Sequence, residues 1–340
     1  MDFRSQISSI ARGKRRILEI GPSYNPIVPK KNGHNVYIVD HADQQSLIEK
    51  YQAYGVDTSS IEPVDFVTTD LASLPVEKHS FDLIVASHVI EHTTDLIKFL
   101  NDCSQLLSDD GTLALLVPDK RYCFDTFRPL TSPGAVITAH HNQHSRHIGG
   151  LLDHYTYFTL NAGSMAWGCN DEIVHKPLHT TEQCKSTLDK SLSTDDYMDA
   201  HEWVFTPSSF RFVIQELSAY ELTDLRVEQY HDTLGFEFFA TLSRNSRRPT
   251  EDKLALLMQA RHEELMPSAL AKSLKETANL LGLDDQDLNQ LADQILQQVH
   301  CLLTERQEYI ALNTPPEPDT QPDPEPTRRW ASLARRIFPA

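Results

Sequence analysis

The chain has 340 residues, of which 40% are hydrophobic and 23% charged, and its formal net charge is −17 at pH 7. These values are typical of a globular protein with one large domain and a smaller addition. The acidic balance disfavours nucleic acid as the main partner, because nucleic-acid binding usually needs a basic surface. Five scattered cysteines without a Cys-x-x-Cys pair argue against a disulfide framework. We expect no signal peptide and no membrane-spanning segment, and therefore a cytoplasmic protein.

The first half of the chain alternates apolar runs with helical patterns. The apolar runs predict five strands, at residues 16–20, 36–40, 63–68, 81–86 and 112–117. Residues 43–53 and 93–107 have the spacing of helices, and Thr93 or Thr94 is the expected N-cap of the second. Asp110-Gly111 predicts a turn before the fifth strand. Because strands that alternate with helices pair in parallel, we expect a Rossmann-like, doubly wound α/β sheet.

The periodicity is lost over residues 119–205, a stretch rich in His, Tyr, Asp and Asn. A long insertion of this kind is usually functional or contains short elements, and we expect a substrate-binding lid. A helix is predicted from Thr206 to about residue 220. Two strands at 222–230 and 236–242 then predict an antiparallel hairpin at the sheet edge. The predicted domain of residues 1–245 therefore contains seven strands.

Three further segments follow this domain. Residues 250–312 predict a helical extension, whose near-heptad apolar spacing suits a homo-oligomer or a partner protein. Residues 313–327 form a Pro-rich acidic linker. Residues 328–340 form a basic tail with one apolar helical face, suited to the inner face of a membrane or to a partner protein. The alternative for this tail is a disordered end with scattered arginines.

Polar residues follow the first three predicted strands at their carboxyl ends, where ligands bind in doubly wound sheets. Gly21 permits close approach of a ligand, and Glu19 either accepts hydrogen bonds from a bound ammonium or holds the loop. Asp40 has the spacing of a carboxylate that binds ribose hydroxyls, with a helix cap as the alternative. Asp70 and Leu71 either bind adenine or form a plain turn.

Three blocks resemble class I S-adenosylmethionine-dependent methyltransferases over roughly residues 14–243. They are Ile17-Leu18-Glu19-Ile20-Gly21, Val39-Asp40 and the stretch 81–92, which ends in Ser87-His88-Val89-Ile90-Glu91-His92. The resemblance implies S-adenosylmethionine as cofactor. It implies cofactor contacts from Glu19, Gly21, Asp40, Asp70, Leu71 and His88. Of the family's Gly-x-Gly-x-Gly only Gly21 is kept, so Ser23 is expected to replace a lost backbone contact.

A hydroxyl acceptor needs a general base, because its proton must be removed during methyl transfer. The candidates are His88, Asp119, His144 and His201. Lys120, Arg121 and Tyr122 follow the fifth strand and are expected to hold the acceptor, the two cations by binding an anionic group. The lid histidines (His140, His141, His144, His147 and His154) are either solvated, catalytic or paired as metal ligands. We expect no metal ion.

Residues 117–129 resemble methyltransferases associated with bacterial surface-polysaccharide synthesis, with Asp125 and nearby aromatics suited to a sugar ring. This favours methylation of a hydroxyl in a sugar, a glycan or a small metabolite. The altered glycine loop supports an alternative, a catalytically inactive methyltransferase-like scaffold or interaction protein. A nicotinamide-dependent dehydrogenase is disfavoured, because Gly-x-Gly-x-x-Gly is absent.

Overall fold

The structure is a computed structural model that describes residues 2–168, 171 and 173–265. All described residues belong to one compact unit.

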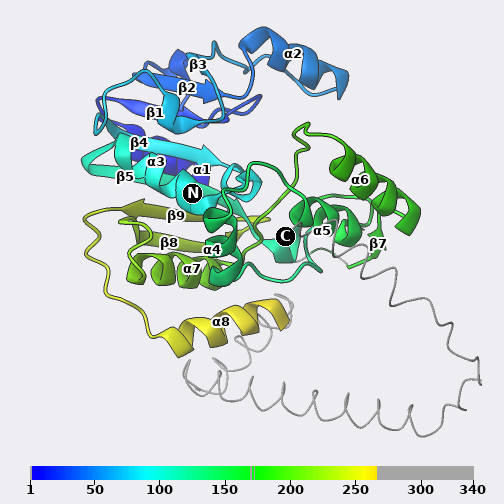
Figure 1. Ribbon diagram of the computed structural model, residues 1–340. Coiled ribbons are helices and arrows are strands. Elements are labelled where there is room, and N and C mark those ends of the chain that lie inside the picture. Colours follow the sequence, from blue (N-terminus) through cyan, green and yellow to red (C-terminus); the bar gives the residue numbers. More distant parts are fainter. Residues whose placement is uncertain (1, 169–170, 172, 266–340) are drawn as a thin grey trace, which may run out of the picture. The chain divides into compact units, whose positions relative to one another are not determined.

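A seven-stranded sheet of order β3-β2-β1-β4-β5-β9-β8 forms the centre of this unit (Figure 1). Its strands are β1 (Ile17–Ile20), β2 (Val36–Asp40), β3 (Phe66–Val67), β4 (Phe81–Ser87), β5 (Leu107–Pro118), β8 (Arg226–Leu234) and β9 (Glu237–Ser243). The first five strands are parallel, β9 pairs antiparallel with β5, and β8 pairs antiparallel with β9. The predicted Rossmann-like sheet with its antiparallel hairpin is therefore confirmed.

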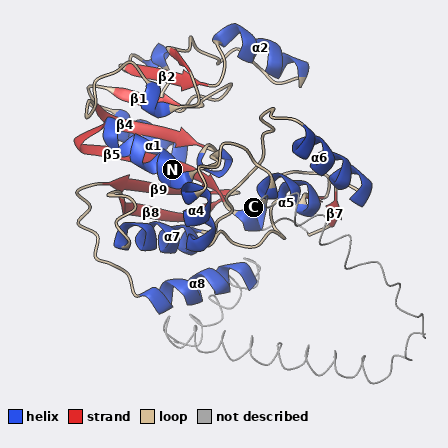
Figure 2. Ribbon diagram, viewed as in Figure 1, coloured by secondary structure: helices blue, strands red, loops and turns tan. Residues whose placement is uncertain are grey.

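Helices cover both faces of the sheet (Figure 2). On one face, α3 (Leu96–Leu106), α4 (Pro133–His141) and α7 (Pro207–Ala219) pack on alternate strand residues such as Ile84. On the other face, α1 (Phe3–Ala11) packs on the intervening residues, such as Val85. Most residues of β1, β2 and β4 are buried on both faces, which explains their continuous apolar runs. Helix α2 (Gln44–Ala53) follows β2 as predicted.

Two local predictions are wrong. The N-cap of α3 is Asp95, whose side chain accepts a hydrogen bond from the Lys98 amide, whereas Thr93 is used elsewhere. The Thr93 hydroxyl donates to the Ile90 carbonyl at 2.8 Å and accepts from the Trp203 indole at 3.1 Å. Asp110-Gly111 also forms no separate turn, because β5 runs through it. A Cβ at Gly111 would lie 2.8 Å from the Phe81 carbonyl oxygen, so glycine allows this irregular, close pairing with β4.

The 119–205 lid contains short elements that its sequence pattern does not reveal. Besides α4 they are α5 (Gly149–Tyr157), α6 (Thr181–Ser193), and the small hairpin of β6 (Thr159–Asn161) and β7 (His175–Pro177). Helix α6 starts with a reciprocal capping box between Thr180 and Gln183. The lid is therefore a folded layer, and its loops approach the carboxyl ends of the central strands.

The C-terminal extension begins with α8 (Lys253–Leu265), which packs along α7 (Figure 1). Glu263 accepts a hydrogen bond from the Ser208 hydroxyl at 2.6 Å, and Arg211 pairs with Glu251. The rest of the predicted helices, the linker and the basic tail lie outside the described residues. Among the helices that are described, none has the length and apolarity needed to cross a bilayer.

Candidate active site

The loop after β1 has an unusual backbone conformation. Gly21 has φ +60°, and its amide donates to the Val39 carbonyl at 2.8 Å. A Cβ at this position would lie 3.2 Å from Cγ2 of Val89, which follows β4. Ser23 also has a positive φ, +48°. The loop therefore passes close to the end of β4, and only glycine adopts its first step without strain.

The side chain of Glu19 fixes the backbone of the loop that follows β1. Its carboxylate is buried and accepts hydrogen bonds from the amides of Ile27 at 2.5 Å and Val28 at 3.1 Å. Burial raises the pKa of Glu19 to about 7, against the effect of the two amide hydrogen bonds, which lower it. Of the two roles predicted for Glu19, the observed contacts are those of loop fixation.

Asp40 lies where β2 ends, and its buried carboxylate faces the same loop. One oxygen accepts hydrogen bonds from the Ser23 amide at 3.0 Å and the Ser23 hydroxyl at 3.3 Å. The other accepts from the His41 amide at 2.8 Å. Ser23, which stands where the family has a glycine, thus donates hydrogen bonds to Asp40, the carboxylate predicted to bind ribose. A ligand with two hydroxyl donors would take over the hydrogen bonds that Ser23 makes now.

Asp70 and Leu71 follow β3. Leu71 is buried in the core, whereas Asp70 is half-exposed and binds the Lys98 ammonium at 2.7 Å. This hydrogen bond lowers the pKa of Asp70. One Asp70 oxygen pairs with Lys98, and the exposed carboxylate keeps acceptor capacity for an amine.

His88 follows β4 and has φ +53°, a strained conformation for a residue other than glycine. Its Nε2 lies 2.7 Å from Oε2 of Glu237 in β9, and its Nδ1 lies 3.6 Å from Oε1 of Glu91. Burial acts to lower the pKa of His88, but the Glu237 hydrogen bond and the two negative charges raise it above the usual value. His88 is thus a carboxylate-oriented histidine, and its side chain is 34% exposed.

His201 is brought to the same region by the segment before α7. Its Nδ1 lies 2.5 Å from Oδ2 of Asp125, and Asp125 also pairs with Arg128 at 3.2 Å. Burial acts to raise the pKa of Asp125, but the charges of His201 and Arg128 lower it to about 2. Burial and the adjacent His201 lower the pKa of His154 to about 3. Asp125 is therefore an ionised internal group that orients His201.

The other predicted acceptor and base residues have internal partners or lie apart. Asp119 is fully buried and accepts hydrogen bonds from Arg121 and from Thr233. Lys120 is buried and pairs with Glu264 of α8 at 2.6 Å. Tyr122 is buried, and the Arg121 guanidinium lies over its ring. His144 is exposed beyond the end of α4. Their predicted functional roles remain predictions.

Several polar residues of this region received no individual role from the sequence. Glu91 and His92 lie in the 3-10 turn Ile90–His92, Glu237 starts β9, and Asp199 contacts His92 at 2.9 Å. The Glu91-His92 pair was visible as part of the block after β4. Glu237 and Asp199 had no sequence signal, because their proximity to His88 and His92 depends on the tertiary fold.

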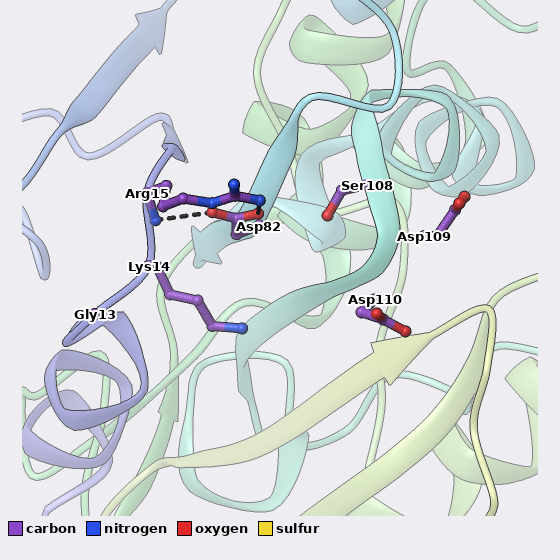
Figure 3. A pocket seen from close by; sticks show the side chains of 7 residues that line it. All are labelled: Gly13, Lys14, Arg15, Asp82, Ser108, Asp109 and Asp110. Carbon is purple, nitrogen blue, oxygen red and sulfur yellow. Dashed lines mark hydrogen bonds and ion pairs between the residues drawn. The ribbon is translucent and has the colours of Figure 1, made fainter.

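A surface pocket of about 340 Å³ lies elsewhere (Figure 3). It is lined by residues before β1 and at the starts of β4 and β5, including Arg15, Asp82 and Asp110. The Arg15 amide donates to the Asp82 carboxylate at 2.7 Å. This is the amino-terminal edge of the sheet, whereas ligands of doubly wound sheets bind at the carboxyl edge. We therefore assign the candidate active site to the strand ends described above.

Comparison with known proteins identifies the kind of domain that carries these strand ends. Residues 18–115, from β1 into β5, match the family model described as a methyltransferase domain. No curated protein matches the chain. The chain is similar in structure to a SAM-dependent methyltransferase from Aquifex aeolicus (11% identity, 71% and 88% of the two chains covered, TM-score 0.36). Another similar structure is an S-adenosylmethionine-dependent methyltransferase from Mesorhizobium loti (12% identity, 70% of this chain and 95% of that chain covered, TM-score 0.36). A third is a putative Zn-dependent alcohol dehydrogenase from Rhodobacter sphaeroides (12% identity, 71% of this chain and 88% of that chain covered, TM-score 0.39). With TM-scores below 0.5, these likenesses support no functional conclusion.

The sheet topology, the residues at the strand ends and the family match define a class I methyltransferase domain. The chain therefore contains an S-adenosylmethionine-dependent methyltransferase domain. The residues present fit this cofactor: Gly21 leaves room for close backbone approach, and Asp40 offers an acceptor-only carboxylate for ribose hydroxyls. When bound, the cofactor supplies a methyl group activated by the sulfonium charge.

Proposed function

We propose that the protein methylates a hydroxyl group of a neutral sugar, glycan or small metabolite. The observation that carries this proposal is the His88–Glu237 pair at the end of β4, at 2.7 Å. A hydroxyl must lose its proton during methyl transfer, and a histidine held by a carboxylate is suited to accept it. Glu237 keeps the imidazole in one orientation, and the partial exposure of His88 lets an acceptor reach it.

The charges of the predicted acceptor residues support a neutral acceptor. Lys120 and Arg121 would attract an anionic group, but they pair with Glu264 and Asp119. Tyr197 of the lid is more than half exposed, and its hydroxyl lies 3.1 Å from Asp199, beside His92. An exposed aromatic ring next to polar groups suits a sugar, which has apolar faces and polar edges.

The resemblance of residues 117–129 to polysaccharide-associated methyltransferases is a lead within this proposal. Asp125 would serve such an acceptor indirectly, because its carboxylate is buried against His201 and Arg128. We propose cytoplasmic action, with attachment to a membrane or partner through residues 328–340 as the further possibility. These residues lie outside the described part of the chain.

The test is methyl transfer from S-adenosylmethionine labelled in its methyl group to a panel of neutral sugars and glycans. We expect labelled product with wild type and with His34→Gln, a control histidine in the loop before β2, and at least a 100-fold lower rate with His88→Gln. Equal rates for His88→Gln and wild type would overturn the role of His88. Failure of the folded protein to bind S-adenosylmethionine or S-adenosylhomocysteine would support the scaffold alternative instead.

A further inference from the structure

Glu91 is a buried carboxylate without a hydrogen-bond donor. It is 1% exposed, and neither carboxylate oxygen receives a hydrogen bond from any residue in the described part of the chain. Nδ1 of His88 lies 3.6 Å and Nε2 of His92 lies 4.0 Å from the Glu91 Oε1 atom. A buried carboxylate in this situation is costly unless a positive charge lies next to it. A cation bound next to Glu91 would therefore stabilise its buried carboxylate.

Besides His88, the imidazoles of His92 and His201 lie near this carboxylate. The rings of His92 and His201 are perpendicular, with centroids 4.6 Å apart. One ligand atom from each of Glu91, His92 and His201 lies within 4.8 Å of the other two. Among the described residues, this is the one group of three potential ligands so close together.

Each imidazole has its own carboxylate partner. Nδ1 of His92 lies 2.9 Å from Asp199, and Nδ1 of His201 lies 2.5 Å from Asp125. Both rings are thus held through Nδ1, which leaves Nε2 of each ring for another partner. Histidines that bind metal ions are typically oriented in this way, by a carboxylate on the second ring nitrogen.

The backbone keeps the group together although its members are far apart in sequence. Glu91 and His92 lie in the turn after β4, and the amides of Glu202 and Trp203 donate to the Glu91 carbonyl at 2.6 and 3.2 Å. The Arg128 guanidinium donates to the His201 carbonyl at 2.7 Å. The segment carrying His201 is therefore anchored directly on the residue that supplies the carboxylate.

We propose that Glu91, His92 and His201 bind a divalent transition-metal ion. Two imidazoles and one carboxylate form a ligand set used for Zn²⁺ and for Fe²⁺, and three protein ligands leave coordination positions open. Metal–ligand bonds of about 2.1 Å place neighbouring ligand atoms roughly 3.0–3.5 Å apart. The observed spacing of up to 4.8 Å requires small side-chain rotations toward the ion.

A role for the ion follows if the proposed function holds. A divalent cation lowers the pKa of an oxygen ligand, so it would assist deprotonation of an acceptor hydroxyl. The hydroxyl proton would pass to His88, the oxygen would form its bond to the methyl carbon, and the methyl–sulfur bond would break. The sulfur keeps the bonding electron pair, which turns the sulfonium into a thioether. Metal binding itself does not depend on this role.

The experiment is calorimetric titration of the untagged, chelator-treated full chain with Zn²⁺, followed by loading with Co²⁺, whose absorption spectrum reports coordination. We expect a single ion per chain in wild type and in the control His34→Gln. Glu91→Gln and His201→Ala should lose at least about 100-fold in affinity. Asp125→Asn, which removes the charge that orients His201 and pairs with Arg128 but leaves the three ligands in place, should lose about 10–100-fold.

S-adenosylhomocysteine binding and circular dichroism of each variant separate loss of the metal site from misfolding. Wild type that binds Zn²⁺ no better than a folded Glu91→Gln variant would overturn the proposal, because the charge of Glu91 would then be balanced by the neighbouring imidazoles. This outcome is independent of the acceptor test. The metal titration requires no methyl acceptor, so either proposal can fail alone.

Discussion

Replacing Gly21 with alanine tests the assignment of the loop after β1 as the cofactor site. At φ +60° an L-residue costs about 1–2 kcal/mol relative to glycine. The new Cβ would also lie 3.2 Å from Val89 Cγ2, so the loop or the end of β4 must shift by a few tenths of an ångström. We expect a loss of roughly 2 kcal/mol in the free energy of unfolding, which corresponds to about 4–8 °C in melting temperature.

The same shift displaces the backbone that the cofactor approaches. We expect Gly21→Ala to weaken S-adenosylmethionine binding at least tenfold, or about 1.4 kcal/mol, in calorimetric titration. Gly33→Ala is a matched control: Gly33 has φ +81°, and its Cβ would meet no described atom within 4 Å. The control should lose similar stability but keep its affinity. Wild-type affinity in a destabilised Gly21→Ala protein would refute the placement of the cofactor at this loop.

Four further predictions concern charged residues of the site and of the lid. Asp40→Ala should abolish cofactor binding in calorimetry, whereas retained binding would exclude Asp40 as the ribose ligand. Glu237→Gln should move the NMR titration midpoint of His88 to lower pH, because Glu237 raises the pKa of His88; an unchanged midpoint contradicts this cause. Glu19 has a folded-state pKa of about 7, above its ordinary 4.5, so the folded state binds the proton more tightly. Stability should therefore fall as pH rises from 4.5 to 7, by roughly 3 kcal/mol, and thermal melts of Glu19→Gln should lack this slope. Gly150→Ala should displace the flexible Glu202 carboxylate, because the added Cβ would lie 2.1 Å from one of its oxygens, and should break its 2.8 Å contact with Nδ1 of His147. The cost in denaturant unfolding should be about 1 kcal/mol or less, since alanine is favoured over glycine in a helix; a larger loss would contradict this reasoning.

The lid illustrates a limit of sequence periodicity. Helix α5 and the β6–β7 hairpin are short, and the longer helix α6 is mostly polar with only two buried residues, so residues 119–205 predicted only an insertion. The same limit applies to Asp119 and Lys120, which follow a strand at the expected edge of the sheet. Their position in the chain was correctly predicted, but their partners, Thr233 and Glu264, are more than 100 residues away.

The sequence by itself determined the strands of the sheet, their mostly parallel pairing and the carboxyl-end positions of Gly21, Asp40 and His88, because strand patterns and turn residues are local. The tertiary structure alone decided which polar groups meet. The carboxylate of Glu91 and the ring of His201 come from segments 110 residues apart, joined by hydrogen bonds of the Glu91 carbonyl to the adjacent backbone. Local sequence patterns do not predict such contacts, because the contacts form only when the lid folds back on the end of β4.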